Sequence, residues 1–218
     1  MKQLVFVTGG TGYLGCELIP RLLARGHQVR ALVRPGSESK LPPSCEVVPG
    51  NALEKNSFAD KIAPAQTFVQ LVGVPHPSPA KARQFRAVDL VSVRESVAAA
   101  SAAKVQHFIY LSVAQPAPIM REYLAVRAEG EALIRASGMN ATFVRPFYVL
   151  GPGHRWPYLI LPLFWIAELL PASRAGAKRL RPVTLGQTLA ALIRSVEAPA
   201  AGIRIVEADE MRGACSRR

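Results

Sequence analysis

Three glycines near the amino terminus have the spacing of a phosphate-binding turn. Gly9, Gly12 and Gly15 form the pattern GxxGxxG between an apolar run typical of a strand and a run with helical periodicity. Gly9 allows a sharp turn, Gly12 lets backbone N–H groups approach a pyrophosphate, and Gly15 lets the helix pack close to the sheet. The start of a helix attracts phosphate charge. The turn therefore predicts a dinucleotide site, with a plain structural turn as the alternative; its other expected contacts are Thr11, Tyr13 and Leu14.

The end of the second predicted strand indicates which dinucleotide the turn would hold. A carboxylate about 20 residues past such a turn binds the ribose 2′-hydroxyl of NAD. Here Arg34 stands in that region, and the next carboxylate is Glu38. A guanidinium can bind a 2′-phosphate through paired charge-assisted hydrogen bonds, and Ser37 and Ser39 would add hydroxyl donors. We therefore expect NADP(H) in preference to NAD, while an ordinary solvated arginine is the alternative.

Strand-like and helical runs alternate along the chain, as they do in βαβ units. Such units produce a parallel sheet with right-handed crossovers, and hence an α/β fold. The predicted strands are 3–8, 29–33, 45–48, 67–72, 107–112, 141–145 and 203–206, and the predicted helices are 13–25, 80–103, 121–137 and 184–196.

The composition fits one folded α/β domain. The chain has 218 residues, of which 50% are hydrophobic and 19% charged. These values exclude a disordered tail, a collagen-like repeat and a highly charged coiled coil. We expect a single domain over 1–218, with a cofactor-binding core at 1–150 and, at 151–218, helices and a last strand that cover the substrate side.

The charge and the metal-binding residue types limit the partners. The net charge of +12 is spread along the chain without a basic, aromatic-interleaved stripe, so no nucleic-acid partner is expected. Three cysteines without CxxC spacing and four scattered histidines predict neither a disulfide framework nor a metal site. The amino-terminal residues lack the pattern of a signal peptide, which together with the cysteine usage predicts a cytoplasmic protein.

The segment 158–170 is apolar on nearly all faces. It is shorter than the roughly 20 residues that cross a bilayer. Two alternatives follow: a helix that lines the substrate side of the fold, or an interfacial segment that makes peripheral contact with a membrane. The first is favoured, because an interfacial helix should have a strongly polar opposite face.

Several stretches together resemble the atypical short-chain dehydrogenase/reductases, and within that group the NmrA-like and complex I accessory-subunit-like nucleotide-binding proteins. The resemblance implies a Rossmann-type doubly wound parallel sheet with a small C-terminal substrate-side extension and a bound NADP, or NAD. The stretches are TGGTGYLG at 8–15, the strand ending in Arg34, VVPGN at 47–51, Leu111-Ser112, the helix from Tyr123 to Leu133, and RPFYVLGPG at 145–153.

The resemblance also implies where further cofactor contacts lie. Asn51 stands where an aspartate usually follows the third strand, near the adenine, and an amide can still bond a base edge. Val72 and Gly73 would run beside the cofactor, where the lack of a side chain at Gly73 permits a close approach. Pro146, in the Arg-Pro stretch, completes the expected cofactor contacts.

Active members of that superfamily use a serine, a tyrosine and a lysine four residues after the tyrosine. The matching residues here are Ser112, Tyr123 and Arg127, so arginine replaces the lysine. By this resemblance Tyr123 would transfer the proton, Arg127 would lower the tyrosine pKa and hold the ribose, and Ser112 would position a carbonyl. The alternative is structural: a strand-end cap, a packed aromatic, and an arginine paired with Glu131.

Two loops offer further candidates for the substrate side. His154, Arg155 and Trp156 would line a pocket at the carboxyl edge of the sheet, and His76 would face the nicotinamide. With the apolar segment nearby, they suggest a small-molecule substrate that is apolar, such as a hydrophobic carbonyl or a quinone. The sequence thus predicts an NADPH-dependent reductase or isomerase. The alternative is a non-catalytic NAD(P)H sensor or assembly factor that docks a protein through 157–181.

Overall fold

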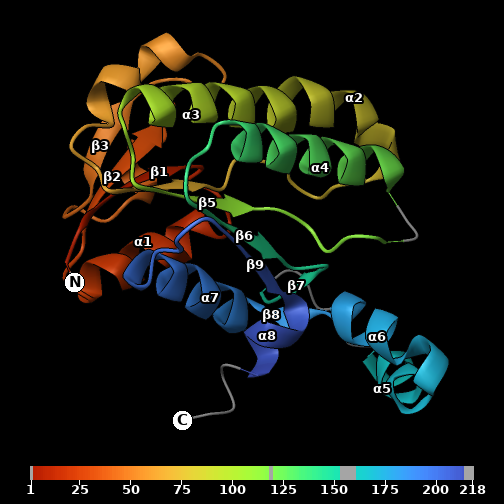
Figure 1. The fold of residues 1–218 in the computed structure, drawn as a ribbon. Coiled ribbons are helices and arrows are strands. Elements are labelled where there is room, and N and C mark those ends of the chain that lie inside the picture. Colours follow the sequence, from red (N-terminus) through yellow and green to blue (C-terminus); the bar gives the residue numbers. More distant parts are fainter. Residues whose placement is uncertain (1, 118–119, 153–160, 214–218) are drawn as a thin grey trace.

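A parallel β-sheet forms the centre of the computed structural model, which describes residues 2–117, 120–152 and 161–213 (Figure 1). Its strand order is β3-β2-β1-β4-β5-β6-β9, and every neighbouring pair is parallel. The doubly wound parallel sheet predicted from the sequence is confirmed. The strands are β1 (Leu4–Thr8), β2 (Gln28–Val33), β3 (Glu46–Pro49), β4 (Thr67–Gln70), β5 (His107–Leu111), β6 (Ala141–Arg145) and β9 (Ile203–Glu207).

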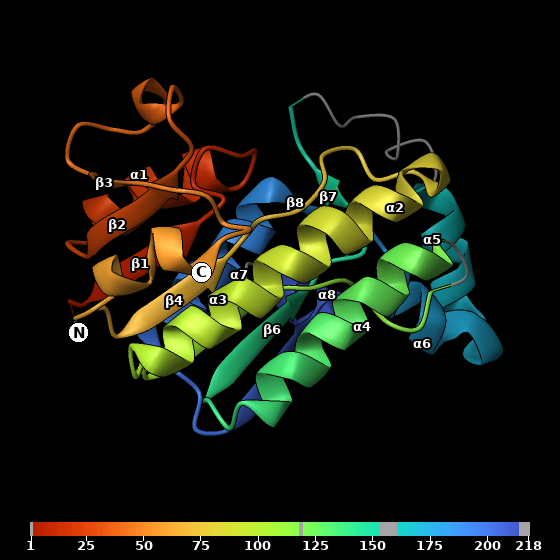
Figure 2. The same ribbon diagram turned by 90° about the horizontal axis from the view of Figure 1, so that it is seen from above.

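Helices cover both faces of this sheet (Figures 1 and 2). One face carries α1 (Gly15–Ala24), α7 (Leu185–Glu197) and α8 (Ala208–Gly213), and the other carries α2 (Ala82–Gln84), α3 (Val91–Ala102) and α4 (Arg121–Ala136). The single helix predicted over 80–103 is divided by a π-helical stretch, η5 (Phe85–Leu90), that joins α2 to α3. Helix α7 begins as its sequence indicates, because Thr184 and Gln187 form a reciprocal capping box.

The sheet is apolar on both faces, which explains the continuous apolar runs of its strands. Val5 and Val7 point into the cluster under α1 and α7, while Phe6 points into the cluster under α3 and α4. In that second cluster the rings of Phe6, Phe68 and Phe108 stack across three adjacent strands, with centroids 5.2 and 5.1 Å apart. The alternation of side chains along β1 therefore anchors both helical layers.

The C-terminal part adds a small substructure beside the sheet. Two short strands pair in parallel, β7 (Val149–Leu150) and β8 (Val183–Thr184). The chain between them contains α5 (Leu161–Leu169) and α6 (Pro171–Leu180), which project from the body in Figure 1. The sequence did not predict β7, β8, α8 or the one-turn helices, because such short elements show no periodicity; α6, with ten residues, was also not predicted. The one-turn helices are η1 (Glu38–Lys40), η2 (Lys55–Ser57), η3 (Ala59–Lys61) and η4 (Pro79–Lys81).

The direction of winding reverses between β1 and β4. After β1 the chain leads to β2 and β3 on one side, and after β4 it leads to β5 and β6 on the other. Loops that leave two adjacent strands in opposite directions leave a crevice at the carboxyl end of the sheet, where ligands of this architecture bind. The glycine turn and the loop after β4 both lie at this point.

Candidate cofactor and active site

The glycine turn lies directly against the loop that follows β4. Gly9 has a φ of +76°, and a Cβ there would come within 2.8 Å of the carbonyl carbon of Leu71 and the nitrogen of Val72. A Cβ on Gly15 would overlap the carbonyl oxygen of Gly9, so only glycine lets α1 start so close to the turn. The N–H of Gly12 closes the turn by donating to the oxygen of Gly9 at 3.1 Å. The tight packing requires Gly9 and Gly15, while Gly12 is exposed.

Helix α1 presents its amino terminus without a side-chain cap. Leu14 occupies the N-cap position and makes no side-chain hydrogen bond to the helix. The N–H groups of Cys16 and Glu17 already donate to the oxygens of Gly12 and Leu14 at 3.0 and 3.3 Å, so the start of α1 would attract an anion chiefly through the helix dipole. The beginning of α1 is therefore suited to a pyrophosphate.

Tyr13 joins this turn to the C-terminal part of the chain. Its side chain is 40% exposed, and its hydroxyl oxygen lies where a Cβ of Gly151 would be. Gly151 follows β7, so the ring of Tyr13 spans from the glycine turn to the β7–β8 substructure. The sequence singled out both stretches, but their contact was not predicted.

Arg34 lies exposed immediately after β2. In the described part of the chain, no carboxylate lies within ion-pairing distance of its guanidinium. The N–H of Ser37 donates to the carbonyl oxygen of Arg34 at 3.1 Å, which folds the loop back at this point. Arg34 and Ser37 are thus brought together at the end of β2.

Asn51 follows β3 and uses both ends of its amide within its own loop. Its Nδ2 donates to Oε1 of Glu54 at 2.9 Å, and its Oδ1 accepts the N–H of Leu53 at 3.1 Å. A base edge would have to compete with these two bonds.

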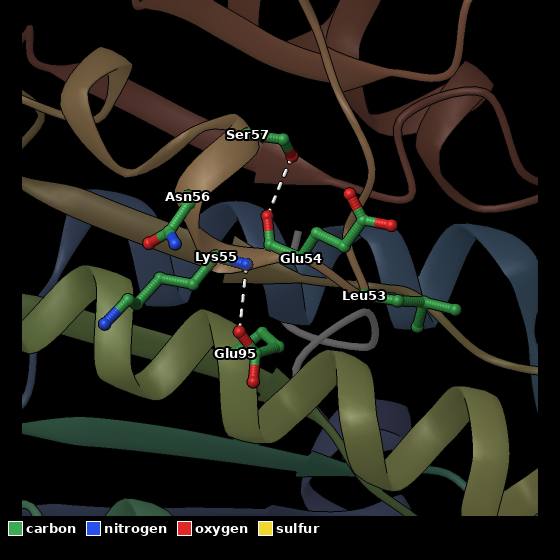
Figure 3. A pocket seen from close by; sticks show the side chains of 6 residues that line it. All are labelled: Leu53, Glu54, Lys55, Asn56, Ser57 and Glu95. Atoms are coloured by element: carbon green, nitrogen blue, oxygen red, sulfur yellow. Dashed lines mark hydrogen bonds between the residues drawn. The ribbon is translucent and has the colours of Figure 1, made fainter.

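A hollow of about 490 Å³ lies next to this loop (Figure 3). It is lined by the residues 53–57, around η2, and by Glu95 of α3. The N–H of Lys55 donates to Oε2 of Glu95 at 2.9 Å and so joins the two walls. None of the lining residues belongs to the glycine turn, so this hollow is not where the turn would place a pyrophosphate.

The absence of a side chain at Gly73 has a structural cause in the protein itself. A Cβ there would lie 2.5 Å from Nη2 of Arg127. The resemblance to short-chain dehydrogenase/reductases implies that Gly73 lets the cofactor approach closely. The structure shows that the guanidinium of Arg127 already takes the space beside the backbone.

Arg127 is buried and holds three segments together. Its Nη2 donates to Oδ1 of Asp89 at 2.6 Å, and its Nη1 donates to the carbonyl oxygen of Leu111 at 2.9 Å. Oδ2 of Asp89 in turn accepts the N–H of Val74 at 3.0 Å. Burial by itself lowers the pKa of Arg127, but Tyr123, Tyr110 and Asp89 outweigh it and raise that pKa, so the guanidinium stays charged.

The ring of Tyr123 packs against this cluster. The ring is half-buried and packs edge-on against Phe85 with centroids 5.1 Å apart. The guanidinium carbon of Arg127 lies 5.1 Å from the centre of the Tyr123 ring. The expected spacing of one helical turn therefore brings Tyr123 and Arg127 into contact, through the ring face.

Ser112 belongs to a second buried network. Its Oγ donates to Oε1 of Glu131 at 2.6 Å. The same oxygen accepts Nε of Arg145 at 2.8 Å, and Nη1 of Arg145 lies 3.1 Å from Oε1 of Glu207. This network ties β5, α4, β6 and β9 together. Glu131 pairs with Arg145, whereas the structural alternative in the sequence analysis had paired it with Arg127.

A chain of buried polar groups runs beneath the crevice between β1 and β4. The hydroxyl of Thr8 donates to the side-chain oxygen of Gln70. Nε2 of Gln70 reaches Oγ of Ser92 at 3.1 Å, and that hydroxyl donates to the carbonyl oxygen of Asp89 at 2.9 Å. Sequence reasoning missed Asp89 and Gln70, and it gave Glu131 the wrong partner. The only signal for Asp89 was a single acidic residue within the apolar stretch 85–93.

The remaining candidates take less defined places. Pro146 is buried, and its carbonyl oxygen accepts the N–H of Ala114 at 3.2 Å. His76 adopts a φ of 47° in the loop after β4. His154, Arg155 and Trp156 lie outside the described residues. Within the described ranges, no group of three potential metal ligands gathers, and no helix is long and apolar enough to cross a membrane.

Comparison with known proteins identifies the family. A family model described as NAD(P)H-binding matches residues 9–154, from the glycine turn through β7. The chain belongs to this NAD(P)H-binding family. The resemblance to atypical short-chain dehydrogenase/reductases that the sequence indicated is thereby confirmed, as is the expectation of a nicotinamide cofactor.

Two curated relatives are similar to this chain over much of its length. The chain is 29% identical over 217 residues to a ceramide reductase of Caulobacter vibrioides, covering 97% of this chain and 66% of the relative. It is 26% identical over 168 residues to 4-hydroxy-2-methyl-3-oxo-4-farnesyl-3,4-dihydroquinoline-1-oxide ketoreductase of Stigmatella aurantiaca, covering 67% and 50%. The chain thus spans two thirds or less of the length of these relatives.

A solved structure has a similar fold. The Bordetella bronchiseptica enzyme WbmG, solved in complex with NAD and UDP, superposes with a TM-score of 0.66 at 20% identity, covering 95% of this chain and 73% of that one. This similarity shows the Rossmann-type fold.

Proposed function

We propose that this protein is an NADPH-dependent reductase of the atypical short-chain dehydrogenase/reductase type that acts on an apolar carbonyl or quinone. The observation that carries the proposal is the position of the glycine turn. The turn and the uncapped start of α1 lie at the carboxyl end of β1, where the winding of the sheet reverses.

Several residues would hold the cofactor. The turn from Gly9 to Gly15 would receive the pyrophosphate, and Arg34 with Ser37 the 2′-phosphate of NADP. Val72 borders the turn, and Asn51 and Pro146 follow β3 and β6 at the same edge of the sheet. The nicotinamide, when bound, supplies the hydride.

Tyr123 would donate the proton that completes reduction of a carbonyl. Its ring contacts the guanidinium of Arg127, and this contact fixes the position of the phenol. Ser112 would position the carbonyl oxygen, exchanging its bond to Glu131 for one to the substrate. Arg127 would position the Tyr123 ring, since its Nη1 and Nη2 are already bonded to Leu111 and Asp89.

The apolar substrate is supported by the two relatives and by α5. Their names specify a ceramide and a farnesyl-substituted quinoline oxide as substrates. Every residue of α5 except Glu168 is apolar. WbmG, by contrast, was solved with UDP, so a nucleotide-linked polar substrate is the comparison that an experiment must include.

Calorimetry and a turnover assay test the proposal. NADPH is titrated into the full chain, followed by NADH. NADPH oxidation at 340 nm is then measured with a ceramide precursor ketone, a farnesyl-substituted quinone and a UDP-sugar. The expected result is NADPH binding and turnover with one of the apolar compounds. If neither NADPH nor NADH produced heat of binding, the cofactor site would be refuted. Turnover of the UDP-sugar alone would refute the substrate class.

A second function is favoured by the state of Arg127. Its guanidinium is bound in an ion pair inside the protein, and the lysine expected at this position is absent. A non-catalytic NAD(P)H sensor would use the same fold and dock a protein through 157–181, of which the structure describes 161–181. It predicts a cofactor-induced rise in melting temperature without turnover of any compound of the panel. It also predicts a protein partner whose binding depends on NADPH.

A further inference from the structure

A patch of apolar side chains on α5 is open to solvent. Within 2–117, 120–152 and 161–213, Tyr13 is the only large hydrophobic residue exposed elsewhere. The side chains of this patch are between 56% and 75% exposed. We call it the apolar patch; its members are Leu163, Trp165, Ile166, Leu169 and Leu170.

The geometry of α5 gathers these residues on one side. At 100° per residue the four patch residues within α5 cover a single continuous arc, which also includes the exposed Pro162, and Leu170 follows directly after the helix. The opposite arc carries the half-buried Phe164, Ala167 and Glu168, and the main neighbour of α5 is α6. A surface helix of a water-soluble protein turns its polar side outward, and α5 does the opposite.

The neighbouring helix supplies the polar, cationic side that α5 lacks. Residues 161–181 contain four basic residues and one acidic residue, Glu168, whose carboxylate pairs with Arg181 at 3.1 Å. The side chains of Arg174 and Lys178 are exposed on α6. Exposed apolar side chains, including a tryptophan, beside exposed cations are the combination that binds a bilayer with anionic headgroups.

We propose that α5 and α6 dock this protein on the surface of an anionic lipid bilayer. The apolar patch would enter the region between headgroups and acyl chains, and Arg174 and Lys178 would lie at the level of the lipid phosphates. By its sequence alone, 158–170 is disfavoured as an interfacial segment, because it lacks a polar face. The structure places that polar side on α6 instead.

The position of this surface relates it to the candidate active site. The segment 151–182 leaves β7 and returns to β8, and Gly151 at its beginning touches Tyr13 of the glycine turn. The docking surface therefore belongs to the same edge of the protein as the proposed cofactor site. If the function proposed above is correct, an apolar substrate would pass from the bilayer to that site without crossing water.

Co-sedimentation with vesicles tests the inference on the full chain. Vesicles of phosphatidylcholine alone are compared with vesicles that contain phosphatidylglycerol, at low and high salt. We expect binding to the anionic vesicles that weakens with salt. The variant I166D/L169D should lose at least about tenfold in partitioning, because it places two charges in the apolar patch. K178E should reduce partitioning onto the anionic vesicles about fivefold or more. R194E, an exposed charge reversal on α7, should leave this partitioning almost unchanged.

Each other outcome would overturn the docking proposal. Equal binding of I166D/L169D and the parent chain would show that the apolar patch is not the contact. A concentration-dependent dimer that I166D/L169D dissociates, without vesicle binding by the parent, would assign the patch to a second copy of the chain. Calorimetry with NADPH on the same variants keeps the two proposals apart: cofactor binding without vesicle binding overturns only the docking surface.

Discussion

Arg127 and Asp89 form a buried ion pair beneath the loop that borders the glycine turn. Their atoms Nη2 and Oδ1 are 2.6 Å apart, and both side chains are almost fully shielded from solvent. Asp89 also accepts the N–H of Val74, and Arg127 also donates to the carbonyl oxygen of Leu111. The pair therefore fixes the loops after β4 and β5 to α4. A position that sequence similarity assigns to catalysis is thus also part of the framework of the site.

Removal of either partner should strongly destabilise the protein. D89A leaves a buried guanidinium without its counter-charge, and R127M leaves a buried carboxylate. Each should lower the free energy of unfolding in urea by about 3–5 kcal/mol. The double variant should lose clearly less than the sum, because neither charge remains uncompensated. R86A, which removes the partner of an exposed pair with Glu122, should cost less than about 1 kcal/mol. Additive losses in the double variant would contradict a direct pair.

A methyl group at position 73 should collide with the guanidinium of Arg127. G73A should lower the free energy of unfolding by about 1–3 kcal/mol, as overpacking of a buried site does. In the R127M background the added methyl should cost less, since the planar group is gone. G176A provides the matched control: nothing lies within 4 Å of its added methyl, and the residue is in a helix. It should be neutral or stabilise by up to about 1 kcal/mol.

The preference for NADPH over NADH should depend on Arg34. Loss of a charge-assisted bond to the 2′-phosphate is expected to weaken NADPH binding by roughly 10- to 100-fold. NADH, which lacks that phosphate, should bind R34A and the parent chain alike. Dissociation constants from calorimetry give both values. K40A removes an exposed positive charge from the same loop and should leave the ratio unchanged; an unchanged ratio in R34A would remove Arg34 from cofactor recognition.

Y123F separates a chemical role of Tyr123 from a packing role. Phenylalanine keeps the ring contacts with Phe85 and Arg127 and loses only the hydroxyl. If the hydroxyl donates the proton, kcat should fall by roughly 10²- to 10⁴-fold. The dissociation constant for NADPH and the melting temperature should stay close to those of the parent. Undiminished turnover would leave Tyr123 with the packing role alone.

His107 should make stability depend on pH in the acidic range. It is fully buried next to Oγ1 of Thr142, and burial lowers its pKa from 6.5 to about 4. As pH falls below 6.5, His107 of the unfolded chain therefore binds a proton, whereas His107 of the folded chain does so only near pH 4. The folded state should lose about 3 kcal/mol between pH 6.5 and 4 from this residue. For H107Q, the free energy of unfolding in urea should fall less steeply with pH over this range than for the parent chain. The same pH dependence in both would exclude His107 as the cause.

Local patterns predicted most of the fold. The apolar runs and their glycine punctuation located all seven strands of the main sheet to within a few residues, because most of these strands are buried on both faces and are therefore rich in apolar residues. The GxxGxxG spacing identified the turn at 9–15, because its tight packing excludes a Cβ at Gly9 and Gly15. A two-residue strand such as β7 left no pattern to detect.

The sequence by itself determined the sheet, the dinucleotide turn and the family, since these depend on short-range periodicity and on residues adjacent in the chain. Only the tertiary structure decided what occupies the space beside Gly73, which acid neutralises Arg127, and which side of α5 meets water. Asp89 is 38 residues from Arg127 along the chain. Such partners are selected by how η5 and α4 pack on the sheet, and no local spacing encodes that choice.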